Sequence, residues 1–317
     1  MLPAIQTPPP RTSHIHSQSR TFNMGTRDME LGGKYLGTLR ESTHLLSDVP
    51  ALQRRMKEDG YLFLRGVQPR EKVLAARQTL VEYLDSKNLL DRSHPLLDAV
   101  MADPGKGAYL GGTSGITHTP ALTSLFESPE ILGFFNRFLG KAALTFNYKW
   151  LRVVAGGETT PAHYDVVFMG RGTCNLYTCW SVLGDVTMEQ GPLAVLHGSH
   201  CLESYRKIKE TYGKADVDRD NINSNFSNDP MEIVDRYGGQ WHSGDFQMGD
   251  VLIFSMLTMH GSLKNKTDRY RISADTRFQP ADEPVDERWA GKDSMGNYAW
   301  KKTPPKTIEE SRKEWGV

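Results

Sequence analysis

Residues 144–154 read LTFNYKWLRVV, and large apolar side chains alternate there with polar ones. This period of two, in residues that favour extended backbone, predicts a strand with one buried face. Similar short apolar runs follow along the chain at Tyr164–Met169, Asn175–Leu183, Leu193–Leu196, Val251–Phe254 and Tyr270–Phe278. From residue 144 onward we therefore expect several short strands joined by glycine-rich turns.

Helices are expected before this β region. Residues 50–59 follow two candidate N-caps, Ser47 and Asp48, and precede a suitable C-terminal stop, Gly60. Residues 71–86 and 128–140 carry apolar side chains at helical spacing. A helical N-terminal third followed by short strands predicts a mainly β fold, a barrel or a double-sheet jelly roll with helices packed outside.

The composition is that of a globular protein. The chain has 317 residues, of which 38% are hydrophobic and 24% charged, which is enough to bury a sizeable core. The 38 basic residues balance the 38 acidic ones, and this argues against binding nucleic acid or a membrane surface through an overall field. No run approaches the roughly 18 apolar residues of a membrane span. Three cysteines, a sparse and odd number, favour a reducing compartment, so the cytoplasm is the predicted location.

One domain is predicted for residues 28–317, because neither an internal repeat nor a second core is apparent. Residues 1–27 contain no acidic residue, three arginines and many Pro, Ser and Thr residues. That composition is typical of a disordered tail, although an organellar transit peptide stays open. The polar segment 202–245 interrupts the strands and is predicted to be a lid-like insertion, or an excursion with its own short helix.

The residues best suited to chemistry are His163 and Asp165. They are two positions apart on a predicted strand, so their side chains share one face. His260, which follows the apolar run at 251–254, is the best candidate for a distant third partner. Two imidazoles and one carboxylate on one face of a metal ion, with the opposite positions open, suit non-haem Fe(II) oxygen chemistry.

A second element of this site is predicted at Arg271, on the strand that follows His260. A planar, permanently charged guanidinium can hold the distal end of a dicarboxylate through two parallel hydrogen bonds. Ser273, two residues further on, would face the same way and could donate to the same carboxylate. The pattern His-x-Asp, His, Arg-x-Ser therefore predicts a single metal and dicarboxylate site.

These motifs resemble the phytanoyl-CoA dioxygenase family of Fe(II)/2-oxoglutarate-dependent oxygenases over most of residues 50–280. Besides the residues above, the matching pieces are Glu58-Asp-Gly-Tyr-Leu-Phe-Leu-Arg-Gly66, Trp180-Ser-Val-Leu-Gly-Asp-Val-Thr187, Gln190-Gly-Pro-Leu-Ala-Val-Leu-His-Gly-Ser-His200, Gly249-Asp-Val-Leu-Ile-Phe254, His260-Gly-Ser262 and Asn265. One departure is at residues 196–198, where the family usually carries a proline before Gly-Ser-His.

The resemblance implies a double-stranded β-helix fold and an enzyme that uses Fe(II), 2-oxoglutarate and O₂. The residues that it implies are His163, Asp165 and His260 for iron, and Arg271, Trp180 and Ser262 for 2-oxoglutarate, in addition to Ser273, which its position two residues after Arg271 indicates. It also implies a small organic substrate, oxidised as 2-oxoglutarate is converted to succinate and CO₂. Halogenating relatives have a small residue in place of the carboxylate, so Asp165 favours hydroxylation, desaturation or cyclisation.

Two alternatives remain. The spacing of Arg271 and Arg277 resembles the paired arginines of AlkB-type nucleic-acid demethylases, but the zero net charge and the lack of a basic stripe speak against that class. A catalytically inactive binding scaffold of the same fold is the other alternative, and the intact His163, Asp165, His260 and Arg271 argue against it. The sequence specifies neither the substrate nor the oligomeric state.

Overall fold

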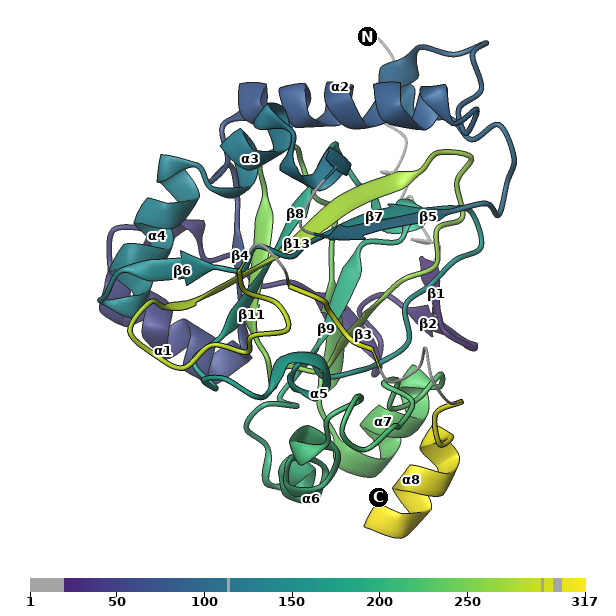
Figure 1. Ribbon diagram of the computed structural model, residues 1–317. Coiled ribbons are helices and arrows are strands. Elements are labelled where there is room, and N and C mark those ends of the chain that lie inside the picture. Colours follow the sequence, from purple (N-terminus) through teal and green to yellow (C-terminus); the bar gives the residue numbers. More distant parts are fainter. Residues whose placement is uncertain (1–19, 113–114, 292–293, 299–303) are drawn as a thin grey trace, which may run out of the picture.

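The computed structural model describes residues 20–112, 115–291, 294–298 and 304–317 (Figure 1). Of the predicted disordered tail, residues 1–19 lie outside this part of the chain. The remainder was predicted wrongly, because residues 20–27 lead into a hairpin of β1 (Thr21–Met24) and β2 (Arg27–Glu30). Phe22 and Met24 are buried in the main core, and this burial orders the segment.

A large antiparallel sheet is the centre of the fold. Its strand order is β4-β11-β8-β13-β7-β5, and β6 pairs with the end of β13. The strands are β4 (Tyr61–Leu64), β5 (Ala108–Gly112), β6 (Ala143–Thr145), β7 (Lys149–Val154), β8 (Tyr177–Val182), β11 (Val251–Ser255) and β13 (Arg271–Pro280). The predicted strand at 144–154 is thus two strands, β6 and β7, and both pair with β13.

A smaller sheet has the order β12-β9-β10-β3. Its strands are β3 (Leu36–Thr38), β9 (Leu193–His197), β10 (Gln240–Ser243) and β12 (His260–Ser262). β3 runs parallel to β10, whereas the other pairings are antiparallel. Leu193 and Val195 of β9 share one apolar cluster with Trp180 and Leu252 of the large sheet, so side chains of the two sheets pack together.

The helices lie on both sides of this core (Figure 1). They are α1 (Val49–Asp59), α2 (Arg70–Ser86), α3 (Pro120–Phe126), α4 (Pro129–Leu139), α5 (Val166–Met169), α6 (Arg206–Glu210), α7 (Pro230–Tyr237) and α8 (Ile308–Trp315). The predicted helices at 50–59, 71–86 and 128–140 are confirmed. Asp48 caps α1 by accepting from the Ala51 N–H at 2.9 Å, and Gly60 ends the helix with φ +78°.

The two faces of the large sheet differ in chemistry because side chains alternate along each strand. On the outer face, Ile272 and Ala274 of β13 pack with α2 and α3, and Phe278 stacks on Phe135 of α4. On the inner face β13 carries Arg271, Ser273, Asp275 and Arg277, and all four are buried. The functional site is built on this inner face.

Two predictions about the fold need correction. The helices and strands together make a mixed fold with a large antiparallel sheet, so "mainly β" was too narrow. The predicted strand Tyr164–Met169 is wrong, because the backbone turns helical at Asp165 and residues 166–169 form α5. Val167 and Met169 are buried in the main core, so tertiary packing overrides the strand preference of this valine-rich run.

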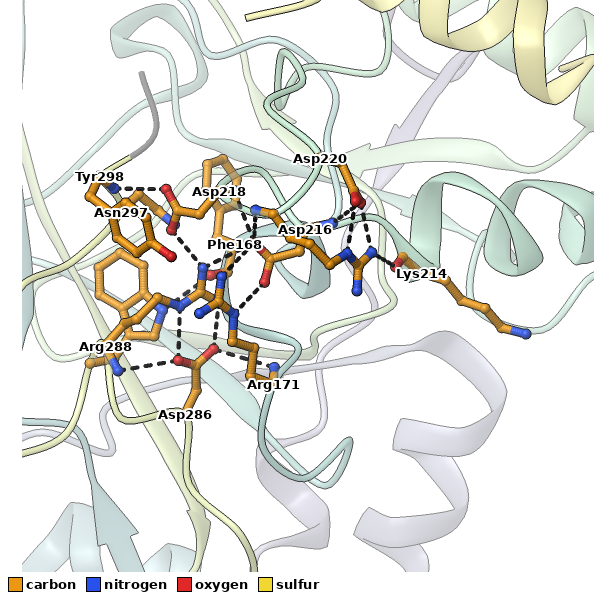
Figure 2. A network of polar contacts seen from close by, with 12 residues as sticks. Phe168, Arg171, Lys214, Asp216, Asp218, Asp220, Asp286, Arg288, Asn297 and Tyr298 are labelled. Carbon is orange, nitrogen blue, oxygen red and sulfur yellow. Dashed lines mark hydrogen bonds and ion pairs between the residues drawn. The ribbon is translucent and has the colours of Figure 1, made fainter. Parts of the chain in front are cut away.

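Segment 202–245 is joined to the rest of the protein by a buried network of charges (Figure 2). The segment contains α6 and α7, and its last residues form β10 of the smaller sheet. Arg288 donates to Asp216 and Asp218 of the segment at 3.2 and 2.7 Å, and to Asp286 at 2.6 Å. Asp218 also accepts from the side chain of Asn297 at 2.8 Å. The network thereby fixes Asp286, Arg288 and Asn297 against the segment.

Removing the Arg288 guanidinium should destabilise the protein strongly. The Arg288→Met variant removes the cation that Asp216, Asp218 and Asp286 share and leaves Arg171 bound to Asp216, so we expect a loss of about 3–5 kcal/mol in the free energy of unfolding, measured by chemical denaturation. Arg219 is the matched control, because it pairs with Asp220 at 2.6 Å on the exposed side of the same network. Arg219→Met should cost less than about 1 kcal/mol, and equal losses in the two variants would contradict the assignment.

Candidate metal and co-substrate site

His163 and His260 are paired by two backbone hydrogen bonds. The N–H of His163 donates to the carbonyl of His260 at 2.9 Å, and the reverse bond is 3.0 Å. The two imidazole centroids are 4.2 Å apart, and both side chains are buried. His260 begins β12, so this bridge ties the smaller sheet to the turn that precedes α5.

Both imidazoles are oriented by the same local contact. The Nδ1 of His163 lies 2.9 Å from the carbonyl oxygen of Pro161, and the Nδ1 of His260 lies 3.0 Å from that of Thr258. Because a carbonyl can only accept, each Nδ1 carries the proton, and each Nε2 lone pair is left for a metal. The two ligands are therefore presented in the tautomer that metal binding requires.

Asp165 completes the set from the first turn of α5. Its Oδ2 accepts a short hydrogen bond from the Thr178 hydroxyl, and its Oδ1 accepts from the Arg277 guanidinium at 3.3 Å. Arg277 and Thr178 are directly opposite each other on β13 and β8, which places both donors on the same side of the sheet. The Oδ1 atom also lies 3.8 Å from Nε2 of His260. The prediction that residues 163 and 165 converge is thus confirmed, although helix entry rather than a continuous strand brings them together.

The three side chains form a compact donor set. One ligand atom from each of them lies within 4.8 Å of the other two, and no other such group occurs among the residues that the structure describes. Two nitrogens and one carboxylate oxygen fit Fe(II), and three ligands leave coordination positions open. The donor chemistry is therefore that of a mononuclear non-haem iron site.

Burial and charge keep the three groups ready to bind a cation. Burial, with a smaller effect from His260, lowers the pKa of His163 to about 3, and burial also lowers the pKa of His260. Burial alone would raise the pKa of Asp165, but the Arg277 cation and the two histidines hold it below its ordinary value. At neutral pH the site is thus two neutral imidazoles and one carboxylate.

Arg271 lies beside this donor set with its charge unpaired. The side chain is buried, its Nη1 donates to the Ser273 hydroxyl at 2.6 Å, and its Nε has no hydrogen-bond partner. Burial, with a smaller effect from Arg152, lowers the pKa of Arg271 to about 10, so it is charged at neutral pH. No carboxylate in the described part of the chain forms an ion pair with it. This uncompensated cation fits an anionic ligand such as a carboxylate of 2-oxoglutarate.

Trp180 and Ser262 lie near Arg271. Both line one small pocket together with Arg271, His163 and His260. The Trp180 ring centroid is 5.8 Å from the Arg271 guanidinium carbon, and the Ser262 oxygen accepts from the Thr160 N–H at 2.8 Å. Ser273 is not among the lining residues of that pocket and instead accepts from Arg271. The structure therefore gives Ser273 a supporting position behind the arginine.

A second, larger cavity of about 430 Å³ shares Arg152, Thr160 and His163 with the small pocket. Phe, Tyr and Trp side chains make up five of its fifteen lining residues. The lining residues are Tyr109, Tyr148, Trp150, Arg152, Thr160, His163, Asp165, Phe168, Met169, Asn225, Arg277, Trp289, Met295, Gly296 and Asn297. Of these, Asn297 bonds to Asp218 in the Arg288 network (Figure 2), and the Gly296 N–H donates to the Arg288 carbonyl at 2.9 Å. A cavity of this size and lining suits a small, largely apolar molecule.

A facial set of two histidines and one carboxylate beside an unpaired arginine is the site of a non-haem iron oxygenase that takes a dicarboxylate co-substrate. The chain belongs to the phytanoyl-CoA dioxygenase (PhyH) family, whose model matches residues 56–273, and so to the Fe/2-oxoglutarate oxygenases. The family resemblance seen in the sequence is confirmed.

Similar proteins act on natural products. The chain is 26% identical over 259 residues to 1-deoxypentalenic acid 11-beta-hydroxylase of Streptomyces exfoliatus, an alignment that covers 76% of this chain and 84% of that one. The solved carbocyclase SnoK from nogalamycin biosynthesis matches with a TM-score of 0.55 at 18% identity, over 84% of this chain and 96% of that one. The epimerase SnoN, solved with Fe3+, alpha ketoglutarate and nogalamycin RO, matches with a TM-score of 0.53 at 16% identity, over 82% and 95% of the two chains. At these identities the two structures establish a shared fold.

Sequence reasoning missed the residues that support the donor set. Thr178 carried no predicted role, and Arg277 stood out only for its spacing from Arg271. The alternation along residues 148–152 predicts that Tyr148 or Arg152 reaches the pocket, and both line the larger cavity. The available signal was the period of two on the last strand, because residues 271, 273, 275 and 277 share one face once Arg271 is placed in the site.

The metal-free protein should lose stability in mild acid because of His163. Its pKa is about 3 when folded, against about 6.5 in an unfolded chain. Below pH 6.5 the unfolded chain takes up a proton that the folded chain does not, so the free energy of unfolding should fall as the pH falls. We expect a contribution of about 2 kcal/mol between pH 7.5 and pH 5, measured by denaturation of the metal-free protein. The His163→Asn variant should show a shallower pH dependence, and an unchanged slope would mean that His163 is not the cause.

Arg277 should control metal affinity because it orients Asp165. In the Arg277→Met variant the carboxylate loses its charged partner, and we expect Mn(II) to bind about 10–100-fold more weakly in an anaerobic calorimetric titration. Arg269→Met is the control, since Arg269 is an exposed arginine just before the same strand. Unchanged Mn(II) affinity in Arg277→Met would show that Thr178 alone positions the carboxylate.

Proposed function

We propose that this protein is an Fe(II)/2-oxoglutarate-dependent dioxygenase that hydroxylates, desaturates or cyclises a small organic molecule and releases succinate and CO₂. The single observation that carries the proposal is the convergence of His163, Asp165 and His260 beside the unpaired cation of Arg271, at the boundary of an aromatic cavity. Each element alone is common in proteins, whereas their combination matches the requirements of this one reaction class.

In this proposal His163, Asp165 and His260 bind iron, and Arg271 binds the distal carboxylate of 2-oxoglutarate. Iron and 2-oxoglutarate together supply the activation of O₂ that oxidises a substrate C–H bond. The protein contributes orientation: the Nδ1–H bonds to Pro161 and Thr258 fix the two rings. Trp180 and Ser262 would line the co-substrate pocket, and Ser273 would support the arginine.

The hydrogen bonds that Asp165 accepts also matter for the reaction. Thr178 and Arg277 both donate to the Asp165 carboxylate, which keeps it ionised and fixes its orientation. Held in that orientation, Asp165 would supply a carboxylate oxygen to iron together with the two histidines. Because the donor set is buried, bulk water has limited access to the reacting atoms.

A small-molecule substrate is supported by the cavity and by the relatives, whose names describe a hydroxylase, a carbocyclase and an epimerase of natural products. No feature of the site favours the nucleic-acid demethylase alternative: Arg277, which suggested it, is buried and bound to Asp165. None of the helices in the described residues has both the length and the hydropathy needed to cross a bilayer.

We also propose an architecture consistent with this activity. The two facing sheets would form a double-stranded β-helix, within a single domain that extends to residue 317. The part of segment 202–245 before β10 would act as a lid, since it carries Asn225 of the cavity wall and is anchored by the Arg288 network. The three cysteines are free in the structure, which agrees with a cytoplasmic location.

The proposal predicts that the purified protein with Fe(II) converts 2-oxoglutarate to succinate, and that His163→Ala or Asp165→Ala abolishes this conversion. Arg271→Gln should act differently, because it removes a charged binding group and leaves the metal ligands in place. We expect its KM for 2-oxoglutarate to rise by about 10–100-fold, on the scale of one or two charge-assisted hydrogen bonds.

Succinate formation and metal binding are measured separately for each variant. Arg92→Gln, an exposed arginine far from the site in the sequence, is the control and should behave as the unmodified protein. Turnover that survives in the His163→Ala variant would refute the assignment of the site. Metal uptake without any 2-oxoglutarate conversion would favour the inactive binding scaffold.

A further inference from the structure

Arg152 presents unused hydrogen-bond donors to the active site. It lies on β7, opposite Ser273 of β13, and its Nε donates to Oδ2 of Asp275 at 2.7 Å. Within the described residues neither of its terminal nitrogens has a hydrogen-bond partner, and 30% of the side chain is accessible. Arg152 lines both the aromatic cavity and the inner pocket that contains Arg271. Its free N–H groups therefore stand between the co-substrate pocket and the larger cavity.

The other two arginines of the site are less accessible. Arg277 is 2% exposed and donates to Asp165. Its Nε and Nη1 have no hydrogen-bond partner among the described residues, but both atoms are buried and the guanidinium carbon lies 4.5 Å from the Trp150 ring centroid. Arg271 is 1% exposed and is the proposed partner of the distal carboxylate of 2-oxoglutarate. Neither guanidinium is accessible from the aromatic cavity to the extent that Arg152 is. Arg152 is therefore the most accessible of the three guanidinium groups for binding a further ligand group.

The charges that line the two cavities do not balance. They are the three cations Arg152, Arg271 and Arg277 and the two anions Asp165 and Asp275. Bound Fe(II) and 2-oxoglutarate would add two positive and two negative charges, which cancel. Glu158, on the wall of a neighbouring cavity, is exposed and accepts from the Ala155 N–H at 2.9 Å, so solvent screens its charge. One positive charge is left, and a monoanionic ligand would compensate it.

The aromatic wall defines the rest of the ligand. Tyr148, Trp150 and Trp289 contact one another, with ring centroids 4.8–5.0 Å apart, and they form a continuous apolar surface on the cavity. Such a surface favours rings or branched hydrocarbon. A cationic ligand, which aromatic walls can also bind, would add to the excess positive charge of this site.

We propose that Arg152 binds a carboxylate of the primary substrate, and that this substrate is a monocarboxylic acid whose apolar body packs on Tyr148, Trp150 and Trp289. The inference rests on the proposed function, because it names the substrate class of the same site. The terminal N–H groups of a guanidinium match a carboxylate in geometry as well as charge. The acid would be held with its hydrocarbon portion beside His163 and Asp165, where oxidation takes place.

One other carboxylate has the same chemistry. The metal-binding end of 2-oxoglutarate also carries a carboxylate, and Arg152 lines the inner pocket as well. The two assignments differ in what they require of Arg152. If it serves the co-substrate, its loss weakens 2-oxoglutarate binding in the absence of any substrate. If it serves the substrate, its loss removes the preference for acids over neutral analogues.

The test compares acids with their neutral isosteres. The probes are fused-ring and branched monocarboxylic acids of about ten to twenty carbons, a size that the cavity can enclose, each paired with its primary carboxamide. Binding to the Mn(II) and 2-oxoglutarate complex is followed by quenching of tryptophan fluorescence, and stimulation of succinate formation is measured with Fe(II). We expect acids to bind at least tenfold more tightly than their amides.

Variants then test whether Arg152 causes the preference for acids over amides. Arg152→Gln should lose most of the acid preference while amide binding changes little, and Arg152→Lys should retain part of it. Because Arg152→Gln leaves Asp275 buried without its partner, the double variant Arg152→Gln with Asp275→Asn provides a neutral pair in case the single variant does not fold. Arg92→Gln is the matched control, since Arg92 also forms a 2.7 Å Nε pair, with Asp85, but on the exposed surface.

Each outcome decides the matter. A loss of acid preference in the Arg152 variants, with 2-oxoglutarate affinity retained, supports the inference. Equal binding of acids and amides by the unmodified protein overturns it, as does an acid preference that persists in the double variant. Weaker 2-oxoglutarate binding without substrate, at unchanged acid preference, assigns Arg152 to the co-substrate and also overturns it. Absence of succinate formation and of metal binding in the unmodified protein would instead refute the proposed function itself.

Discussion

The structure depends on one strand, β13, that is buried along its whole length and has faces of opposite chemistry. The outer face is apolar and anchors the helices, whereas the inner face carries two arginines, a serine and an aspartate. Charges in such a place are tolerated only when each has a partner. Arg277 pairs with Asp165 and Asp275 with Arg152, but Arg271 has no anionic partner in the described residues. The sheet thus contains a buried cation, Arg271, whose charge an anionic ligand would compensate.

The metal donors are held in place by pairing of the same kind. His163 and His260 are fixed twice, by the backbone bridge between them and by the identical Nδ1 contacts to carbonyls two residues earlier. Asp165 is fixed by Thr178 and Arg277, which are neighbours across two paired strands. The geometry of three ligands from distant parts of the chain therefore relies on main-chain pairing rather than on loop conformation.

The larger cavity has a different origin. One side is the rigid inner face of β7, with Trp150 and Arg152, and the other is built from the region after residue 285, which the Arg288 network holds against segment 202–245. The residues of the metal and co-substrate site can therefore lie on the sheets, whereas part of the cavity wall comes from segments outside them. The solved epimerase and carbocyclase share this fold, and in general a fold does not determine which reaction a protein catalyses.

The sequence by itself determined the capped helices, most strands of the large sheet, the donor residues and Arg271, because these depend on local spacing and on which side chains suit iron and a carboxylate. It did not determine α5, where core packing of Val167 and Met169 overrides the preference of a valine-rich run for strand. It could not assign Thr178 or Arg277, or give the ion-pair partner of Arg152, because these depend on strand register and on which charges meet after folding. Partner choice among buried charges is a property of the tertiary structure, since only folding brings residues a hundred positions apart within hydrogen-bond distance.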